Sequence, residues 1–341
     1  MIVRSKAPLR IGLAGGGTDV SPYSDIYGGA ILNATINLYA RTTIIPREDK
    51  KIIIRMVDQN TTLEYDAVPV LPTEGKGALQ KAVYNRMVKD FNMQVQGFEM
   101  LTYIDAPPGS GLGTSSTLTV SVLGAFAEWF SLPLGEYDLA HLAYQIERID
   151  LNMAGGKQDQ YAATFGGFNY MEFYANDKVI INPLRVNSKI INELSNNIVL
   201  FYTKTSHDSS EIITQQQQNV KAKNSSSIEA MHHIKEQALH MKEALLKGEL
   251  DKIGDVLNEG WEYKKRMASG ISTDLFEKIY RTAMAAGARG GKISGAGGGG
   301  FIFFYCPENK RYAVIEALSH LDCNPYAVEF TKEGLKTWTI R

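Results

Sequence analysis

The chain is organised around residues 107–116, which read Pro107-Pro108-Gly109-Ser110-Gly111-Leu112-Gly113-Thr114-Ser115-Ser116. An apolar run from Phe98 to Ile104 precedes this stretch and has the composition of a buried strand. The residues from Thr117 to Phe130 follow it with the apolar spacing of a buried helix. The sequence therefore predicts a strand, a glycine-rich loop and a helix in succession.

The glycine-rich loop has the features of an anion-binding site. Its alternating glycines allow backbone N–H groups to converge on one point, and the following helix adds unpaired N–H groups and the positive end of its dipole. One hydroxyl at the helix start could cap the helix and another could reach a phosphate-bound metal. An ordinary glycine turn with a hydroxyl cap is the alternative. The predicted phosphate-binding residues are Pro108, Gly109, Ser110, Gly111, Leu112, Gly113, Thr114, Ser115 and Ser116.

Two common phosphate-binding loops do not fit the sequence. A Walker loop requires Gly-Lys-Ser/Thr, but Gly113 is followed by Thr114 and no lysine lies nearby. The Rossmann spacing GxGxxG occurs at residues 295–300, but an apolar, strand-like run from Phe301 to Tyr305 follows it where the Rossmann loop requires a helix. The predicted loop belongs to neither class.

The overall composition is typical of a globular protein large enough for two domains. The 341 residues are 44% apolar and 21% charged, and 36 Lys and Arg residues nearly balance 37 Asp and Glu residues. This balance predicts no nucleic-acid partner. The amino terminus lacks the apolar core of a signal peptide, and no run approaches the roughly 18 apolar residues of a membrane span, so we expect a cytoplasmic protein without a membrane partner. Cys306 and Cys323 are expected to be reduced, buried thiols.

Periodicity predicts an α+β protein whose composition changes near residue 183. We therefore divide the chain into domains of residues 1–182 and 183–341. The first half is predicted to contain strands over 1–14, 29–46 and 51–57, helices over 77–92 and 134–150, and a hairpin over 166–182. Strands 29–46 and 51–57 are expected to be neighbours. The second half is predicted to contain strands over 198–202, 301–305 and 326–330, and helices over 209–267 with a break at 224–227, 272–286 and 308–321.

Several polar residues outside the loop could carry chemistry. Asp19 ends a glycine turn after the first strand, and its carboxylate could hold sugar hydroxyls, although a turn residue is the alternative. Glu147 lies beside the apolar face of its predicted helix, where it could point inward to a cation, although a solvated glutamate is the commoner case. Asp159 could accept a proton from an attacking hydroxyl while Lys157 offsets phosphoryl charge, although a helix-start aspartate is the alternative.

A third glycine-rich stretch covers residues 290–300. Seven of its eleven residues are glycine, which costs too much backbone entropy for a mere spacer in a compact domain. We therefore expect this stretch to approach a ligand or another loop closely.

The stretches 7–19, 107–116 and 292–300 stand in the order and spacing of the GHMP kinases, which include galactokinase, homoserine kinase, mevalonate kinase and phosphomevalonate kinase. The resemblance spans nearly the whole chain. It implies an amino-terminal domain like the second domain of ribosomal protein S5, a ferredoxin-like carboxy-terminal domain and a cleft between them. It also implies ATP in the loop 107–116 and Mg²⁺ as a cofactor.

The resemblance also assigns roles to individual residues. Ser115 and Glu147 match the metal ligands of family members, and the pair Asp159-Gln160 matches the galactokinase branch, which makes Asp159 the expected general base. Arg10 stands where that branch has an arginine able to hold this aspartate ionised. The candidate substrate-binding residues are Gly16, Gly17, Thr18, Asp19, Lys157, Gly297 and Gly298.

One departure from the galactokinase pattern bears on the substrate. Galactokinases have Glu-His before Thr-Asp, where this chain has Gly16-Gly17, and we expect the missing side chains to leave room for a larger substituent. The Gly-Gly-Gly-Thr-Asp form resembles the branch that phosphorylates the anomeric C1 hydroxyl of D-glycero-D-manno-heptose 7-phosphate, for nucleotide-activated heptose synthesis. Fucokinases, with tryptophan at the third position, resemble it less. Lys6, Lys157 and Lys204 are candidates for binding the distal phosphate.

Two other functions compete with that of an ATP-dependent sugar kinase. A non-catalytic sensor that binds sugar and ATP would be expected to have lost the acid, the arginine or the metal ligand, and this chain retains all of them. A decarboxylase of the mevalonate branch disagrees with the Asp-Gln pair. The expected partner is a small sugar phosphate, and the sequence leaves monomer or homodimer open.

Overall fold

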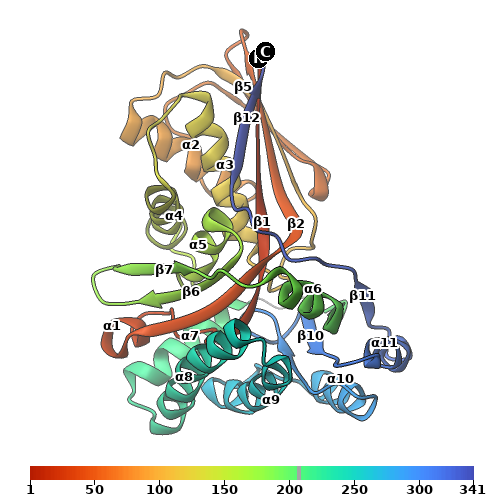
Figure 1. Cartoon of the computed structure of the whole chain (residues 1–341). Helices are drawn as coiled ribbons and strands as arrows, with labels where there is room; N and C mark the ends of the chain where they lie inside the picture. The colour runs from red at the N-terminus through yellow and green to blue at the C-terminus, as the bar shows by residue number, and fades with distance from the viewer. Residues whose placement is uncertain (206–208) are drawn as a thin grey trace.

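The computed structural model describes residues 1–205 and 209–341, and its first layer is an eight-stranded sheet. Six strands follow the order β12-β1-β2-β5-β3-β4, and the hairpin β6–β7 is attached to β2. The long strands β1 and β2 run through the whole molecule (Figure 1). Their bounds, with those of the other strands of this sheet, are β1 Ile2–Ala14, β2 Gly29–Arg47, β3 Lys51–Met56, β4 Thr61–Asp66, β5 Gly97–Ile104, β6 Phe168–Phe173, β7 Val179–Pro183 and β12 Lys336–Ile340.

Helices cover one face of this sheet. Helix α3 is the central one, because it is buried over most of its length and contacts both β1 and β2. The glycine loop ends at its first residue, so burial of α3 fixes the position of the loop. The helices of this part are α1 Tyr23–Tyr27, α2 Ala78–Phe91, α3 Thr114–Trp129, α4 Glu136–Gln145 and α5 Gln158–Phe165.

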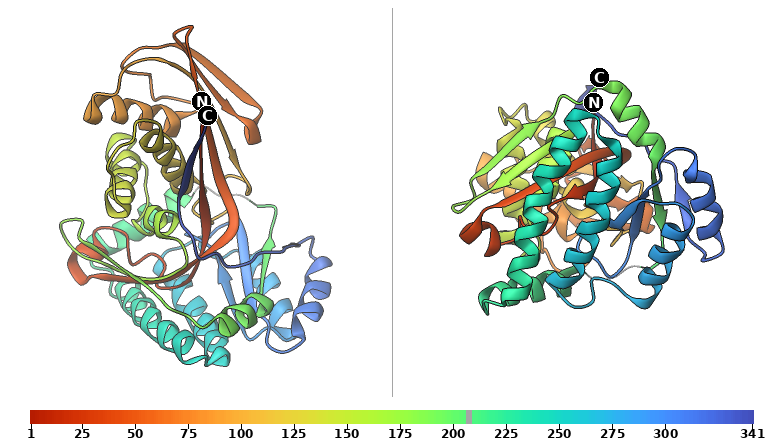
Figure 2. Two further views of the ribbon diagram at one scale, coloured as in Figure 1. Left: turned by 45° about the horizontal axis from the view of Figure 1, so that its top comes forward. Right: turned by 60° about the horizontal axis from the view of Figure 1, so that its bottom comes forward.

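The second layer is a four-stranded antiparallel sheet with the order β11-β8-β10-β9. Helices α8 and α9 lie side by side across the lower part of the molecule (Figure 2). They reach β1 and β2, so the second domain packs against the end of β1 that leads into the Asp19 turn. The elements are α6 Ser188–Asn197, β8 Ile198–Tyr202, α7 Ser209–Lys221, α8 Ser225–Lys247, α9 Leu250–Met267, α10 Asp274–Ala285, β9 Gly290–Ile293, β10 Phe301–Tyr305, α11 Lys310–Ser319 and β11 Asn324–Tyr326.

The last strand returns to the first sheet. Strand β12 pairs antiparallel with β1, and Ile2 lies opposite Ile340. The two ends of the chain therefore lie together (Figures 1 and 2). The predicted second domain, residues 183–341, contains this strand even though the strand belongs to the first sheet. The division at residue 183 itself stays a prediction.

Several predicted elements are wrong in detail. The strands predicted over 29–46 and 51–57 are not neighbours, because β5 lies between β2 and β3 and pairs with both. The helical stretch 209–267 has a second break at Gly248, whose positive φ of 72° ends α8. The helix predicted over 134–150 finishes in a π turn at residues 146–150. Strands β4, β9 and β12 and helices α1 and α6 were not predicted, and β11 lies at 324–326 rather than at 326–330. Among the described residues, no helix is long and apolar enough to cross a bilayer.

Candidate active site

A cavity of about 780 Å³ lies between the glycine loop, the end of β1, the start of α5 and the second domain. Helices α7 and α9 supply its far wall. The cavity contains three acidic and three basic side chains, and their arrangement decides what the site can bind. These are Asp19, Glu147 and Asp159, with Arg10, Arg148 and Lys264.

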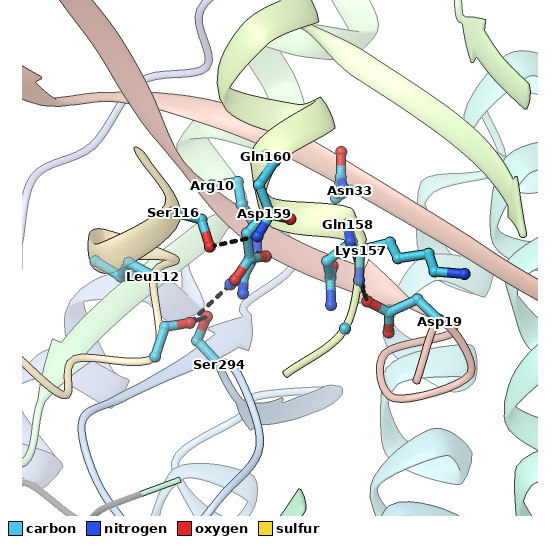
Figure 3. A network of polar contacts seen from close by, with 12 residues as sticks. Arg10, Asp19, Asn33, Leu112, Ser116, Lys157, Gln158, Asp159, Gln160 and Ser294 are labelled. Carbon is cyan, nitrogen blue, oxygen red and sulfur yellow. Dashed lines mark hydrogen bonds and ion pairs between the residues drawn. The ribbon is translucent and has the colours of Figure 1, made fainter. Parts of the chain in front are cut away.

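Arg10 and Asp159 form an ion pair at the centre of the site (Figure 3). The Arg10 Nε lies 2.6 Å from Asp159 Oδ1, and only 4% of the arginine side chain is exposed. Its Nη1 donates to the Gly111 carbonyl at 2.7 Å. Arg10 therefore ties the aspartate on α5 to the glycine loop.

The glycine loop presses its backbone against Asp159. Gly109, Gly111 and Gly113 all have positive φ, which is the conformation that L side chains rarely adopt. A Cβ at Gly113 would lie 3.2 Å from Asp159 Oδ2. The glycines thus allow a phosphate held by the loop to lie beside this carboxylate without an intervening side chain.

The third glycine-rich stretch packs on this loop, which is one of the two alternatives that its composition predicts. Ser294 Oγ donates to the Gly111 carbonyl at 2.9 Å. A Cβ at Gly111 would lie 2.2 Å from the Ser294 carbonyl oxygen, and one at Gly300 would lie 2.4 Å from the Ser110 carbonyl oxygen. The close approach is between two loops, which explains the density of glycine in both.

Asp19 lies at another side of the cavity. Its Oδ2 accepts hydrogen bonds from the backbone N–H groups of Lys157 at 2.8 Å and Gln158 at 3.0 Å (Figure 3). Its Oδ1 is buried and has no hydrogen-bond partner among the described residues. Burial raises the pKa of this carboxyl group, with the two backbone N–H groups opposing that shift. This unpaired oxygen is suited to accept a hydrogen bond from a hydroxyl group of a bound sugar.

Glu147 is connected through Gln160 to Ser116 at the start of α3. It is fully buried on the π turn, and burial raises its pKa. Gln160 Nε2 donates both to Glu147 Oε2 and, at 3.0 Å, to Ser116 Oγ. The second carboxylate oxygen, Oε1, has no hydrogen-bond partner among the described residues. Gln160 therefore holds Glu147 beside the loop with one oxygen free.

These residues fit a magnesium ion that ATP would bring. No cluster of three or more His, Cys, Asp or Glu side chains able to hold a metal occurs in residues 1–205 and 209–341. Magnesium needs no such cluster, because it is commonly bound by one or two protein oxygens together with substrate phosphates. Glu147 Oε1 and the hydroxyl of Ser115, which is exposed and lines the cavity, are suitable oxygens.

The other predicted substrate-binding residues have different roles in the structure. Thr18 is buried and donates to the Gly15 and Ala30 carbonyl groups, so it shapes the turn. Gly297 and Gly298 do not line the cavity, and the N–H of Gly298 donates to the Ile271 carbonyl at 2.9 Å. Gly16 does not line it either, but its carbonyl group faces Lys264.

None of the three lysines expected at the distal phosphate lines this cavity. Lys157 Nζ pairs with Asp177 at 2.8 Å, so its ammonium group does not offset charge beside Asp159. Its backbone N–H, which binds Asp19, is the part that serves the site. Lys204 pairs with Asp322 at the surface, and Lys6 lies over the Tyr39 ring.

The expected room beside Gly17 is also absent. A Cβ at this position would lie 2.7 Å from Met267 Cε and 3.2 Å from the Gln216 side chain. Gln216 Nε2 donates to the Gly17 carbonyl at 2.7 Å. The expectation of space for a larger substituent at Gly17 is therefore wrong, because side chains of the second domain fill it.

Sequence reasoning missed Lys264 and Arg148. Lys264 lies within a long helical stretch of α9, and Arg148 directly follows Glu147 on the π turn. Both line the cavity. Their local sequence does not distinguish them from solvated cations on a helix. Lys264 points inward because α9 packs against β1, and Arg148 points inward because it lies on the π turn.

Comparison with known proteins agrees with this geometry. Family models described as "GHMP kinases N terminal domain" and "GHMP kinases C terminal" match residues 78–167 and 241–321. The chain is 48% identical to D-glycero-alpha-D-manno-heptose 7-phosphate kinase of Campylobacter jejuni, over 99% of both chains. The chain belongs to the GHMP kinase family. It is an ATP-dependent sugar kinase with a small-molecule substrate, and the predicted family and two-domain fold are confirmed.

Solved structures and a more distant relative complete the comparison. The crystal structure of a D-glycero-D-manno-heptose 1-phosphate kinase from Bacteroides thetaiotaomicron is 46% identical, with a TM-score of 0.86 over 99% of both chains. A Lactococcus lactis galactokinase in complex with galactose has a TM-score of 0.77 at 20% identity, covering 98% of this chain and 95% of its own, which shows the fold alone. L-fucokinase/L-fucose-1-P guanylyltransferase of Bacteroides fragilis is 27% identical, and the match covers 90% of this chain but 35% of that protein.

Proposed function

We propose that this GHMP kinase phosphorylates the anomeric C1 hydroxyl of D-glycero-D-manno-heptose 7-phosphate, and that the product serves the synthesis of a nucleotide-activated heptose. The observation that carries the proposal is the joint presence of the Arg10–Asp159 pair beside the glycine loop and of an orphaned Asp19 oxygen in one cavity. The 48% identity to the heptose 7-phosphate kinase of Campylobacter jejuni over the full chain supports the choice of sugar.

The mechanism follows from the positions of these groups. The glycine loop and the start of α3 bind the ATP phosphates through backbone N–H groups. Asp19 orients the sugar, and Asp159 accepts the proton of the attacking hydroxyl. Arg10 holds the Asp159 carboxylate in place and stabilises negative charge that develops on the transferred phosphoryl group. Mg²⁺, held by Ser115 and Glu147, would neutralise part of the phosphate charge. Alignment supplies most of the rate, because phosphoryl transfer asks little covalent chemistry of the protein.

A panel of acceptors tests the substrate. ATP consumption with Mg²⁺ should be measured with D-glycero-D-manno-heptose 7-phosphate, L-fucose, galactose, mannose and mevalonate. We expect turnover on the heptose phosphate and at least tenfold lower kcat/KM on the other compounds. Turnover on fucose alone would retain the mechanism and replace the substrate. Absence of turnover on every compound, with ATP still bound, would favour a non-catalytic sensor.

Asp159→Asn tests the general base. Because positioned general bases contribute about 10²- to 10⁴-fold, we expect kcat to fall by that factor while ATP affinity changes less than about threefold. Asp322→Asn, at an aspartate that is 78% exposed on the second domain, is the matched control and should retain wild-type kcat. An Asp159→Asn protein with unchanged kcat would remove Asp159 from the mechanism.

A further inference from the structure

Two buried ammonium groups lie beside the turn that holds Asp19. Lys264 on α9 is 4% exposed and its Nζ donates to the Gly16 carbonyl at 3.0 Å. Lys292 on β9 is 9% exposed, and a Cβ at Gly16 would lie 3.7 Å from its Nζ. Neither lysine forms an ion pair within residues 1–205 and 209–341. A buried cation without an ion-pair partner costs free energy, and an anion bound beside it would offset that cost.

Of these two lysines, Lys264 lines the cavity and Lys292 does not. The charged groups that act on Lys264 are Asp19, which favours its charged form, and Arg10, which opposes it; Lys264 and Arg10 in turn oppose the charge on Lys292. Burial is the larger cause in both cases and lowers the pKa of Lys264 to about 8 and that of Lys292 to about 7. A bound phosphate dianion beside Lys264 would favour the charged form of this lysine, as Asp19 does.

The other cavity cations are already engaged. Arg10 donates to Asp159 and to the Gly111 carbonyl, at the end where phosphoryl transfer takes place. Arg148 donates through Nε to the Gly156 carbonyl at 3.2 Å, and its guanidinium group packs on Gly155, where a Cβ would lie 2.3 Å away. Within the part of the chain that the structure describes, Lys264 donates only to the Gly16 carbonyl, which leaves two further N–H groups to donate.

We propose that Lys264 binds the distal phosphate of the sugar phosphate substrate. This proposal rests on the proposed function, because it requires an acceptor that carries a phosphate away from the reacting hydroxyl. Asp19 then holds the sugar, with its reacting hydroxyl at Asp159 and its distal phosphate at Lys264. The arrangement selects phosphorylated over unphosphorylated sugars.

A pair of acceptors separates this role from a structural one. We would measure kcat/KM for D-glycero-D-manno-heptose 7-phosphate and for the same heptose without phosphate, in wild type, Lys264→Met and Arg148→Met. Lys252→Met, at a lysine that is 63% exposed on the same helix, is the matched control. Loss of a charge-assisted hydrogen bond should lower the preference for the phosphorylated sugar by about 10- to 100-fold in Lys264→Met. Lys264→Met should lose less activity on the unphosphorylated heptose than on the phosphorylated one, and the Lys252→Met preference should stay within about threefold of wild type.

Three outcomes would overturn the proposal. An equal loss on both acceptors in Lys264→Met would mean that the lysine only holds the Gly16 carbonyl. A lost preference in Arg148→Met with an intact preference in Lys264→Met would place the phosphate at the arginine. A wild-type enzyme that prefers an unphosphorylated sugar would contradict the proposed substrate itself, which is a different result from either of the first two.

A measurement on the wild-type protein covers the case in which Lys264→Met does not fold. Near pH 8 the phosphate monoester is already a dianion, whereas Lys264 is only partly protonated. Calorimetry with ADP present, in two buffers that differ in ionisation enthalpy, should therefore detect proton uptake when heptose 7-phosphate binds and none with the unphosphorylated heptose. Equal proton uptake with both sugars, or none with either, would contradict binding at Lys264.

Discussion

Gly111 connects all three glycine-rich stretches at a single peptide unit. Its carbonyl oxygen accepts hydrogen bonds from Arg10 at 2.7 Å and from Ser294 at 2.9 Å. Its φ is 77°, and the Cβ that any other residue would carry lies 2.2 Å from the Ser294 carbonyl oxygen. The position therefore requires glycine for two independent reasons, the backbone conformation and the contact with the other loop.

Substitution of Gly111 by alanine separates these reasons when it is compared with Gly75→Ala. Gly75 has a similar φ of 72°, but no atom lies within 4 Å of the position that a Cβ would occupy there. We expect Gly75→Ala to cost about 1 kcal/mol of unfolding free energy from backbone strain alone, with full activity. Gly111→Ala should cost about 2–4 kcal/mol and raise KM for ATP at least tenfold. Denaturant unfolding and kinetics measure both, and equal costs would mean that the loop contact is unimportant.

Lys292 predicts an unusual dependence of stability on pH. Its folded pKa of about 7 lies below the ordinary lysine value of 10.5, so between these values the unfolded chain binds more protons than the folded one. Stability from this group therefore rises as pH increases from about 7 to 10.5 and is lowest below that window. Lys292→Met removes the cost of burying the charge, so its stability gain over wild type should be larger at pH 6.5 than at pH 9.5.

Urea unfolding of wild type and Lys292→Met at these two pH values measures the difference, which we expect to be on the order of 1–3 kcal/mol. Lys252→Met, exposed to solvent, should show no such pH-dependent difference. A gain for Lys292→Met that is the same at both pH values, or larger at pH 9.5, would contradict a depressed lysine pKa.

At the residue scale, sequence reasoning identified residues whose chemistry is tied to a motif. Arg10, Asp19, Glu147 and Asp159 were all predicted as site residues, and the structure brings all four to one cavity. Their assigned roles stay predictions. Lys264 was not found, because it stands on a long amphipathic helix whose inward-facing positions depend on which strand the helix packs against. That information is in the tertiary structure and not in the local pattern.

At the scale of elements, apolar residues were sufficient to locate the buried helices and strands. Helices α2 and α3 and strands β5 and β10 were predicted to within a few residues. Helix α2 has apolar residues at helical spacing, whereas α3 and β10 are apolar stretches that are buried over nearly their whole length. The order in which the strands pair was harder to predict from the sequence. The insertion of β5 between β2 and β3 is parallel on one side and antiparallel on the other, and no local signal specifies such an order.

Two of the missed strands are polar or rich in glycine. Strand β12, Lys336–Ile340, is mostly exposed and alternates too weakly to stand out. Strand β9 reads Gly-Gly-Lys-Ile, which does not differ in composition from the glycine-rich loop that follows it. Its glycines are needed because a Cβ at Gly290 would lie 2.0 Å from the Gly254 carbonyl oxygen on α9. Glycine indicates close packing of a strand here, although it is usually typical of a turn.

At the scale of the whole molecule, the pairing of β12 with β1 predicts that the chain can be circularly permuted. A short Gly/Ser linker from residue 341 to residue 1, with new ends between Gly75 and Lys76 in an exposed loop, should keep every strand pair. We expect the permuted protein to retain kcat within about threefold and to lose at most about 2 kcal/mol of unfolding free energy.

The matched comparison is a linear chain that ends at Lys332. It loses β12 and also Leu335, whose side chain packs against Gly124 of α3. This shortened chain should be less stable than the permuted protein by several kcal/mol, as measured by denaturant unfolding. A permuted protein that fails to fold while the shortened chain folds would show that the junction of the two ends is not what completes the sheet.

The same pairing has a consequence during synthesis on the ribosome. Strand β1, which carries Arg10, is translated before the other strands of this sheet, whereas β12, which covers its outer edge, is translated after all of them. Until β12 has left the ribosome, the nascent chain presents an open strand edge that neighbouring chains could pair with. We therefore expect messages truncated before residue 336 to yield products that aggregate, and chaperones to engage the nascent chain until β12 has been translated.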